Sequence, residues 1–418
     1  MIKTNTKKEI IELHEREARI FPRSALFDNL GKARVFSSIR EMSAIEIRET
    51  LSGPELRVQG LIGLLPLTPE LSLNLKTKFP ISNLWHMLTI ANSACDAFLP
   101  VTRQYSTSNS LAPHQVLIRS FCFYLKSINT QGIARDYVQE KHTGYYKPKI
   151  NFGKTVKNYL SRGNDIEVFS DVFSFSPNLT ANQYLKSACL EFLKIIPNSL
   201  NFEEERFLLL DSLNALDRIP SAPLPENYQI SLSQIPSWII DSYKNALKIY
   251  SIYLGHERIG FSYDPQGSSL PSFIFSLDTI FEDFVRNYLN KSFLSEKISV
   301  KDGNKHKNQK TLFTDNRRFP VKPDLIFQQK KNVLGVGEIK YKPKIDEKDR
   351  YQLISHVMAL RAPLGVWISP AHGERTTIER IGSTTNGAEF YHCKISLSDD
   401  IEVSSEEMAK KIKKIILK

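Results

Sequence analysis

The stretch VKPDLIFQQKKNVLGVGEIKY, residues 321–341, decides how the C-terminal part of the chain folds. Two runs rich in branched and aromatic apolar residues flank a polar turn at Lys330, Lys331 and Asn332. Such runs on either side of a short polar turn predict a β-hairpin. Both runs are apolar enough to predict a buried place within a larger sheet rather than a hairpin at the surface.

The expected hairpin brings two acidic residues together. If its turn is centred on Lys331, residues equally far from Lys331 pair across the strands, which places Asp324 opposite Glu338. Their Cβ atoms would then lie roughly 4.5 to 5.5 Å apart. Carboxylates at that distance repel each other unless a cation lies between them, so they suit Mg²⁺ or Mn²⁺. Lys340 follows Glu338 by two residues and is therefore expected on the same face of its strand.

These three residues fit one chemistry, the hydrolysis of a phosphodiester. That reaction needs acidic ligands for a divalent cation and a basic or cationic group for the attacking water. We therefore predict Asp324, Glu338 and Lys340 as catalytic residues, with the two carboxylates as metal ligands. The alternative is an ordinary Glu–Lys pair on a surface hairpin. The apolar strands favour function, because a buried carboxylate cluster is costly without a compensating role.

A helix containing Asp349 is expected directly downstream of the hairpin. Gln352 and His356 are four residues apart and so share one face of this helix. We predict them as accessory residues of the site, and the alternative is a solvated polar face.

The composition indicates a large, packed protein with an anionic partner. A chain of 418 residues favours two or three domains, and 41% hydrophobic with 24% charged residues is typical of a folded protein. The formal net charge of +11 favours binding to a polyanion such as nucleic acid. No apolar run reaches the roughly 18 residues of a membrane span, and the N-terminus lacks the apolar core of a secretion signal. We expect no membrane contact and a cytoplasmic protein.

The cysteines predict neither disulfides nor zinc. Cys95, Cys122, Cys189 and Cys393 lie far apart, without the paired spacing of a metal site. We expect buried free thiols.

The rest of the chain reads as a mixed α+β region followed by helices. Short apolar runs, alternation and helical periodicity predict strands at 56–67 and 71–76, a helix at 83–92 capped by Ser82, and helices at 113–135 and 181–194. Proline-rich residues 219–227 predict a connector, and 264–269 and 301–310 predict polar loops. A helix beginning near Phe273 is expected to open a C-terminal domain. We therefore predict domains at 1–255 and 256–418.

The hairpin motifs resemble those of PD-(D/E)XK nucleases, and the chain as a whole resembles the McrC family of nuclease subunits. The resemblance rests on the order of short segments at residues 60–65, 73–79, 85–88, 149–156, 180–186 and 281–285, followed by Lys322-Pro-Asp324 and Glu338-Ile-Lys340-Tyr-Lys. The family often has Asp-Ala-Lys where this chain has Glu-Ile-Lys, a change that the motif tolerates.

The resemblance implies a fold, a metal site and a partner. It implies an α+β N-terminal and helical middle region followed by an α/β restriction-endonuclease-like domain, with Glu282 on the first helix as a further metal ligand. It also implies that an McrB-like AAA+ GTPase ring recognises methylated double-stranded DNA, docks residues 1–255 and activates Mg²⁺-dependent cleavage. Gly153-Lys154-Thr155 lacks the upstream glycine of a Walker A loop, because Pro148 occupies that position, so nucleotide binding is expected on another chain.

Two other functions agree with the same residues. One is a repair or recombination nuclease that works with a helicase. The other is a catalytically silent DNA-binding or ring-docking adaptor that retains the fold.

Overall fold

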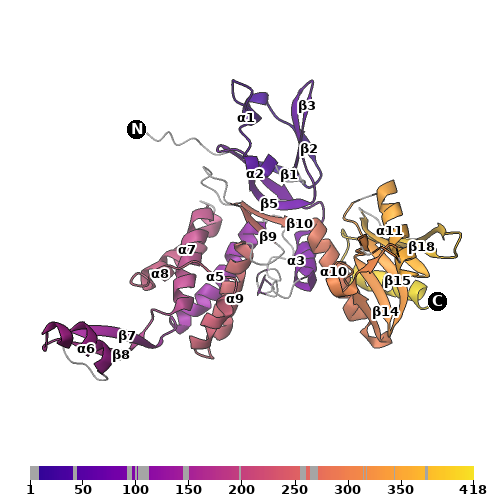
Figure 1. Ribbon diagram of the computed structural model, residues 1–418. Coiled ribbons are helices and arrows are strands. Elements are labelled where there is room, and N and C mark those ends of the chain that lie inside the picture. Colours follow the sequence, from indigo (N-terminus) through magenta and orange to yellow (C-terminus); the bar gives the residue numbers. More distant parts are fainter. Residues whose placement is uncertain are drawn as a thin grey trace. The chain divides into compact units, whose positions relative to one another are not determined.

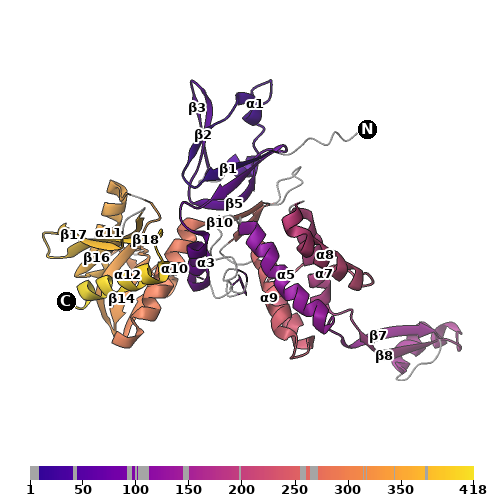
Figure 2. The same cartoon turned by 180° about the vertical axis from the view of Figure 1, so that it is seen from behind.

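The computed structural model describes residues 9–40, 45–91, 97–98, 101, 113–144, 150–196, 199–254, 260–263, 272–313, 315–316, 318–342, 344–371 and 375–418. The chain forms two compact units (Figures 1 and 2), the first made of Met1–Val116 with Ile252–Lys418 and the second of Leu117–Ser251. The second unit ends close to the predicted boundary at residue 255. The N-terminal residues, however, belong to the same unit as the C-terminal domain, which differs from the predicted division into 1–255 and 256–418.

A shared sheet explains why the two ends of the chain form one unit. Its strand order is β1 (Glu9–His14), β6 (Leu71–Lys76), β5 (Leu61–Pro66), β10 (Ser272–Ser276) and β9 (Gly260–Tyr263). Strand β10 pairs antiparallel with β5, so the chain returns to the N-terminal sheet after the second unit. The helix predicted near Phe273 therefore begins later, at Leu277, because the residues before it hydrogen-bond as a strand and Ser276 caps the helix.

The other predicted elements of the N-terminal region are present. The strand predicted at 71–76 is β6, and Leu71, Leu73 and Leu75 are buried as its alternation requires. In the described residues, this region also contains a smaller sheet and helices: β2 (Ala18–Ile20), β4 (Gly53–Val58), β3 (Ile45–Thr50), α1 (Arg23–Leu26), α2 (Ser37–Arg40) and α3 (Ile81–Ala91). Helix α3 begins one residue before Ser82, which therefore lies in its first turn rather than capping it.

The C-terminal part is a mixed sheet with helices packed against it. In the described residues its strand order is β11 (Ile298–Lys301), β14 (Leu325–Gln329), β15 (Asn332–Ile339), β16 (Leu364–Ala371), β18 (Glu389–Ser396) and β17 (Thr377–Ser383). The associated helices are α10 (Leu277–Ser292), α11 (Glu347–Leu360) and α12 (Ile401–Ile416). Helix α11 connects the parallel strands β15 and β16, so the predicted hairpin β14–β15 lies inside the sheet rather than at its edge.

Helices α3 and α10 join the N-terminal region to the C-terminal sheet, and Figure 1 shows them side by side. The side-chain amide of Asn287 on α10 donates to the carbonyls of Ile90 and Ala91 at the end of α3. The buried amide of Asn83 on α3 donates to the carbonyl of Leu397 at 2.8 Å. These bonds satisfy backbone groups that would otherwise be left unpaired at the contact.

The second unit is helical with one long hairpin. It contains α5 (Pro113–Gln131, which begins in the first unit), β7 (Asp136–Gly144), α6 (Phe152–Asn158), β8 (Val168–Ser176), α7 (Thr180–Ile195), α8 (Glu203–Ala215) and α9 (Ile240–Tyr253). Buried Asn182 on α7 accepts a hydrogen bond from the Tyr243 hydroxyl at 2.6 Å. Lys186, one turn further, donates to three carbonyls that follow α8. The segment that resembles the family's middle region therefore has structural roles here.

Short elements fill several connections. These are the 3₁₀ helices η2 (Leu160–Arg162), η3 (Leu200–Phe202), η4 (Tyr228–Gln234), η5 (Leu294–Glu296) and η6 (His306–Asn308), and the strands β12 (Lys310–Thr311) and β13 (Pro320–Val321). The predicted connector at 219–227 contains neither helix nor strand, and the predicted loop at 301–310 contains turns and η6 between β11 and β12. The predicted loop at 264–269 lies outside the described residues.

The described cysteines are buried. Cys122, Cys189 and Cys393 are buried free thiols as predicted, whereas Cys95 lies outside the described residues. Across the described part of the chain, no helix combines the length and apolar character that a membrane crossing requires.

Candidate active site

The observed hairpin has the predicted register at the candidate site. Leu325 on β14 lies opposite Gly337 on β15, so the next pair outward is Asp324 and Glu338. The Asp324 carboxylate accepts a hydrogen bond from the backbone N–H of Ile339 at 2.8 Å. Both acidic side chains are buried, and Glu338 has no exposed surface. The hairpin therefore places two carboxylates together inside the protein.

The turn itself is one residue shorter than predicted. Gln329 pairs with Asn332, which leaves Lys330 and Lys331 as a two-residue turn, with Lys330 in the left-handed region at φ +54°. A shorter turn alone would shift the register by one residue and move the acidic residues apart. A bulge in the middle of the hairpin adds one residue to β15 and restores the register.

Glu338 is held from two sides. One oxygen lies 2.6 Å from Nδ1 of His356 on α11, and the other lies 3.1 Å from Nζ of Lys340. The second oxygen is buried and has the lysine as its ion-pair partner without a well-directed hydrogen bond. This carboxylate oxygen therefore keeps acceptor capacity for a further positive group.

The surroundings of Lys340 keep it charged. Burial lowers the pKa of its ammonium, but the carboxylates of Glu338 and Asp324 outweigh burial, and the net shift of the pKa is upward. The side chain is only partly exposed, so its charge is directed toward the carboxylates. Lys340 is suited to stabilise negative charge, and less suited to remove a proton from water.

The surroundings of Asp324 disfavour its ionised form. Burial, together with the nearby carboxylates of Glu338 and Glu282, raises the pKa of Asp324 to about 8. The hydrogen bond from Ile339 and the charge of Lys340 oppose this shift without overcoming it. The protein alone does not supply enough positive charge for its acidic residues here, as expected of a site that accepts a cation.

Glu282 lies on α10 near the pair, but it has another partner. Its carboxylate forms an ion pair with Arg286 one turn later. Arg286 also donates to Asp283 at 2.6 Å and to the backbone carbonyl of Asp324 at 3.3 Å. Burial raises the pKa of Glu282 despite the guanidinium. Arg286 was not among the predicted site residues, although its four-residue spacing from Glu282 on a helix is a local signal for such a pair.

Helix α11 brings one of the two accessory candidates into contact with the core of the site. It begins at Glu347 with a capping box between Asp346 and Asp349. His356 is buried against Glu338. Gln352 is half-buried one turn earlier, and in the described residues no hydrogen bond links its amide to the site.

The described residues contain no preassembled cluster of three or more acidic, histidine or cysteine side chains that could hold a metal ion. The donor set nevertheless fits a hard divalent cation, because Asp324 and Glu338 offer buried carboxylate oxygens and one of these lacks a hydrogen bond. The charge of Glu282 also acts on Asp324, but Glu282 would have to leave Arg286 to serve as a ligand.

The N-terminal region reaches the strand end that carries Lys340. The hydroxyl of Tyr341, the next residue, donates to the buried carboxylate of Glu15 at 2.8 Å. The guanidinium of Arg16 lies over the ring of Tyr341, 5.3 Å from its centre. No local pattern indicates this contact, because these residues are far apart in the chain.

The Gly-Lys-Thr segment has a simple local structure. Gly153, Lys154 and Thr155 lie within α6, and Asn151 caps this helix by accepting from the Lys154 N–H at 3.1 Å. Thr155 accepts a hydrogen bond from the N–H of Phe169 in β8. The segment is thus part of a short helix packed on the β7–β8 hairpin.

Fold and site together define a mixed α/β protein whose C-terminal sheet carries a buried carboxylate pair with a lysine. Residues 56–368 match the family model described as "McrBC 5-methylcytosine restriction system component", and the chain belongs to this family.

Comparison with solved structures supports the fold. The chain is similar to one in the refined half-complex from the tetradecameric assembly of Thermococcus gammatolerans McrB AAA+ hexamers with bound McrC, with 13% identity, a TM-score of 0.63 and coverage of 97% of this chain and 100% of that chain. A chain of the cryo-EM structure of the Thermococcus gammatolerans McrBC complex is 16% identical, with a TM-score of 0.45 and coverage of 68% and 88%. No curated protein matches the chain in sequence.

Proposed function

We propose that this chain is the DNA-cleaving subunit of a modification-dependent restriction system. In this proposal the C-terminal domain has the PD-(D/E)XK layout and hydrolyses phosphodiester bonds with Mg²⁺ or Mn²⁺. The observation that carries the proposal is the buried pair of Asp324 and Glu338. The Nζ of Lys340 lies 3.1 Å from a carboxylate oxygen of Glu338. Membership of the McrBC family supports the restriction system as its setting.

The energetic cost of this arrangement favours an enzyme over a silent adaptor. Two buried carboxylates side by side destabilise a fold unless a cation or a proton compensates them. At neutral pH an unfolded aspartate is ionised, whereas burial and its neighbours raise the pKa of Asp324 to about 8. Without a metal, the folded protein must therefore hold a proton on Asp324, at a cost in stability. A protein that only docked or bound DNA would gain nothing from it.

Each residue of the proposed centre has its own task. Asp324 and Glu338 would hold the metal, with Glu282 as a further ligand once it is released from Arg286. When bound, the metal would lower the pKa of the attacking water and offset charge on the phosphate. Lys340, kept as an ammonium by its neighbours, would stabilise the charge that develops on the phosphate oxygens. His356 would orient Glu338 through the hydrogen bond between its Nδ1 and the carboxylate.

The partner and the substrate belong to the same proposal. The similar Thermococcus structure is described as McrB AAA+ hexamers with bound McrC. We infer that this chain likewise works with an AAA+ GTPase ring of the McrB type, which selects methylated double-stranded DNA and triggers cleavage. The net charge of +11 agrees with a DNA substrate. In this proposal the chain acts on its DNA substrate in the cytoplasm.

A cleavage assay tests this function. Methylated and unmethylated plasmids are incubated with the full chain and Mg²⁺, with and without a McrB-type GTPase and GTP. We expect cleavage of methylated DNA, and a loss of about 100-fold or more in Asp324→Asn and Lys340→Gln. The matched controls Asp315→Asn and Lys330→Gln change exposed residues of the same domain and should cut normally.

The possible results separate the three functions. Cleavage that ignores methylation would indicate a repair or recombination nuclease instead. DNA binding without metal-dependent cleavage, in every combination of partner and nucleotide, would indicate an adaptor. Cleavage that survives in Asp324→Asn and Lys340→Gln would show that the catalytic centre lies elsewhere.

A further inference from the structure

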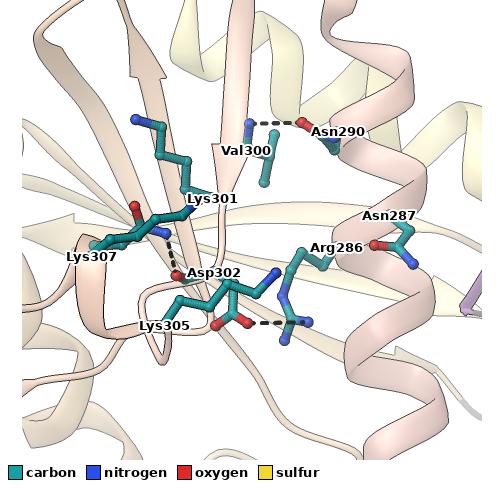
Figure 3. Close-up of a pocket in the computed structure, with 9 residues that line it drawn as sticks. Arg286, Asn287, Asn290, Val300, Lys301, Asp302, Lys305 and Lys307 are labelled. Carbon is teal, nitrogen blue, oxygen red and sulfur yellow. Dashed lines mark hydrogen bonds and ion pairs between the residues drawn. The ribbon is translucent and has the colours of Figure 1, made fainter. Parts of the chain in front are cut away.

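A polar cavity of about 500 Å³ lies beside the candidate active site (Figure 3). One wall is helix α10, which contributes Arg286 and Asn290. The other is formed by the end of β11, which contributes Lys301, and by the segment that follows it, which contributes Lys305 and Lys307. The same helix thus carries Glu282 toward the catalytic pair and Arg286 toward the cavity.

The lysines leave the cavity with an excess of positive charge. In the described residues, none of Lys301, Lys305 and Lys307 forms an ion pair with a carboxylate. Arg286 differs, because Glu282 and Asp283 neutralise it and the Asp302 carboxylate lies 3.9 Å away. The Asp302 carboxylate also lines the cavity, but it lies next to the Arg286 guanidinium rather than pairing with a lysine. An anion in the cavity would therefore meet an excess of positive charge on the residues that line it.

Internal hydrogen bonds fix the lysine-bearing segment. The carbonyl of Asp302 accepts from the side-chain amide of Asn308 at 2.7 Å, and its carboxylate accepts from the N–H of Asn304 at 2.8 Å. On the opposite wall, Asn290 on α10 accepts from the N–H of Val300 at 3.1 Å. These bonds shape the segment into a wall of the cavity.

The lysine-bearing wall is hydrogen-bonded to Pro323, the residue before Asp324. The N–H of Gly303 donates to the carbonyl of Pro323 at 3.0 Å, and a Cβ at position 303 would lie only 2.4 Å from that oxygen. Only glycine allows this close approach. From the other wall, Arg286 donates to the carbonyl of Asp324. Direct hydrogen bonds therefore connect the walls of the cavity to the segment that carries Asp324.

We propose that this cavity binds a backbone phosphate of DNA next to the phosphodiester that is cleaved. The inference rests on the proposed nuclease function and names how the same site holds its substrate. Lysine ammonium groups bind phosphate as point charges and do not read bases, so the subsite would position the strand for any sequence. Recognition of the modified base would then fall to other parts of the assembly.

Salt-dependent DNA binding tests the subsite without requiring catalysis. The full chain is titrated in EDTA against a fluorescent duplex of about 30 base pairs at several salt concentrations. In Lys305→Gln/Lys307→Gln we expect binding about 10-fold weaker at low salt and a slope of log K against log salt smaller by up to about 2. Lys330→Gln/Lys331→Gln removes two exposed charges at the far end of the hairpin and is the matched control.

The control variant distinguishes DNA binding at the cavity from a non-specific effect of removing two positive charges. Equal losses in both double variants, or no loss in Lys305→Gln/Lys307→Gln, would overturn the proposal. Restored binding in Lys305→Arg/Lys307→Arg would support it, because arginine keeps the charge. Inorganic pyrophosphate is titrated in parallel. If it binds in a lysine-dependent way while the DNA slope stays unchanged, the cavity serves a small anion and the DNA assignment fails.

The outcome is independent of the nuclease test. A lysine-dependent salt slope in a chain that never cleaves DNA would retain the phosphate subsite and reject the nuclease. Metal-dependent cleavage with an unchanged slope, and with unchanged KM for DNA, would retain the nuclease and reject the subsite.

Discussion

Replacing Asp324 with asparagine should stabilise the metal-free protein while abolishing its activity. Asparagine keeps an oxygen that can accept the hydrogen bond from Ile339, and it removes the negative charge that Glu338 and Glu282 repel. In the wild-type protein, burial and these neighbours raise the pKa of the Asp324 carboxyl to about 8. The predicted effect therefore depends on pH in a defined direction.

The size of the effect follows from the pKa difference. An unfolded aspartate has a pKa near 3.9, so the folded state binds a proton more tightly across about four pH units. The stability from this proton is complete below pH ~4 and is lost as pH rises toward ~8. The full pKa shift corresponds to a change of about 5 kcal/mol in the free energy of unfolding. The lost attraction between Asp324 and Lys340 offsets part of this gain, and we expect Asp324→Asn to be about 2–4 kcal/mol more stable at pH 8.

Thermal unfolding in EDTA provides the assay. The wild-type transition of the first unit should fall between pH 5 and pH 8, whereas that of Asp324→Asn should change less, and Mg²⁺ should raise the wild-type transition selectively. The control Asp315→Asn replaces an exposed residue of the same domain. Equal pH dependence in wild type and Asp324→Asn, or destabilisation by Asp324→Asn at pH 8, would refute the reasoning.

Three further predictions concern residues around the candidate centre. In His356→Asn, Glu338 loses a buried partner at 2.6 Å, and we expect Mg²⁺ affinity and cleavage to fall about 10- to 100-fold, measured by metal titration of activity. In Tyr341→Phe, the Glu15 carboxylate loses the hydroxyl that donates to it at 2.8 Å, which should cost about 1–3 kcal/mol in denaturant unfolding. Glu15→Gln should not be less stable than wild type at pH 8, because burial raises the pKa of Glu15 and its ionised form is the costly one. Unchanged activity in the first variant, or unchanged stability in the second, would contradict these assignments.

The contact between Tyr341 and Glu15 connects the N-terminal region to the end of β15, which carries the candidate site. Tyr341 directly follows Lys340, and its ring also packs against Phe281 on α10, with centroids 5.5 Å apart. A displacement of the N-terminal region would therefore act on the strand end that carries the lysine and on the helix that carries Glu282. The architecture gives the N-terminal region a direct physical connection to the candidate centre.

The sequence alone was sufficient to predict the hairpin and its paired carboxylates. Alternation and a polar turn are local properties, and strand pairing across a short turn leaves few registers that bury the apolar residues. The position of Lys340 follows from the two-residue period of a strand. The placement of His356 against Glu338 required the structure, because it depends on how α11 packs against β15.

Long-range contacts were decided by the tertiary structure. No local pattern indicates that β10 pairs with β5 or that Glu15 contacts Tyr341. None indicates that Gly303 approaches the carbonyl of Pro323, next to Asp324. Local patterns determine which residues form strands and helices, because they reflect one segment's own periodicity and turns. Which segments meet is determined by packing of the whole chain, and at this site that packing adds Arg286 and the cationic cavity to the three residues of the hairpin.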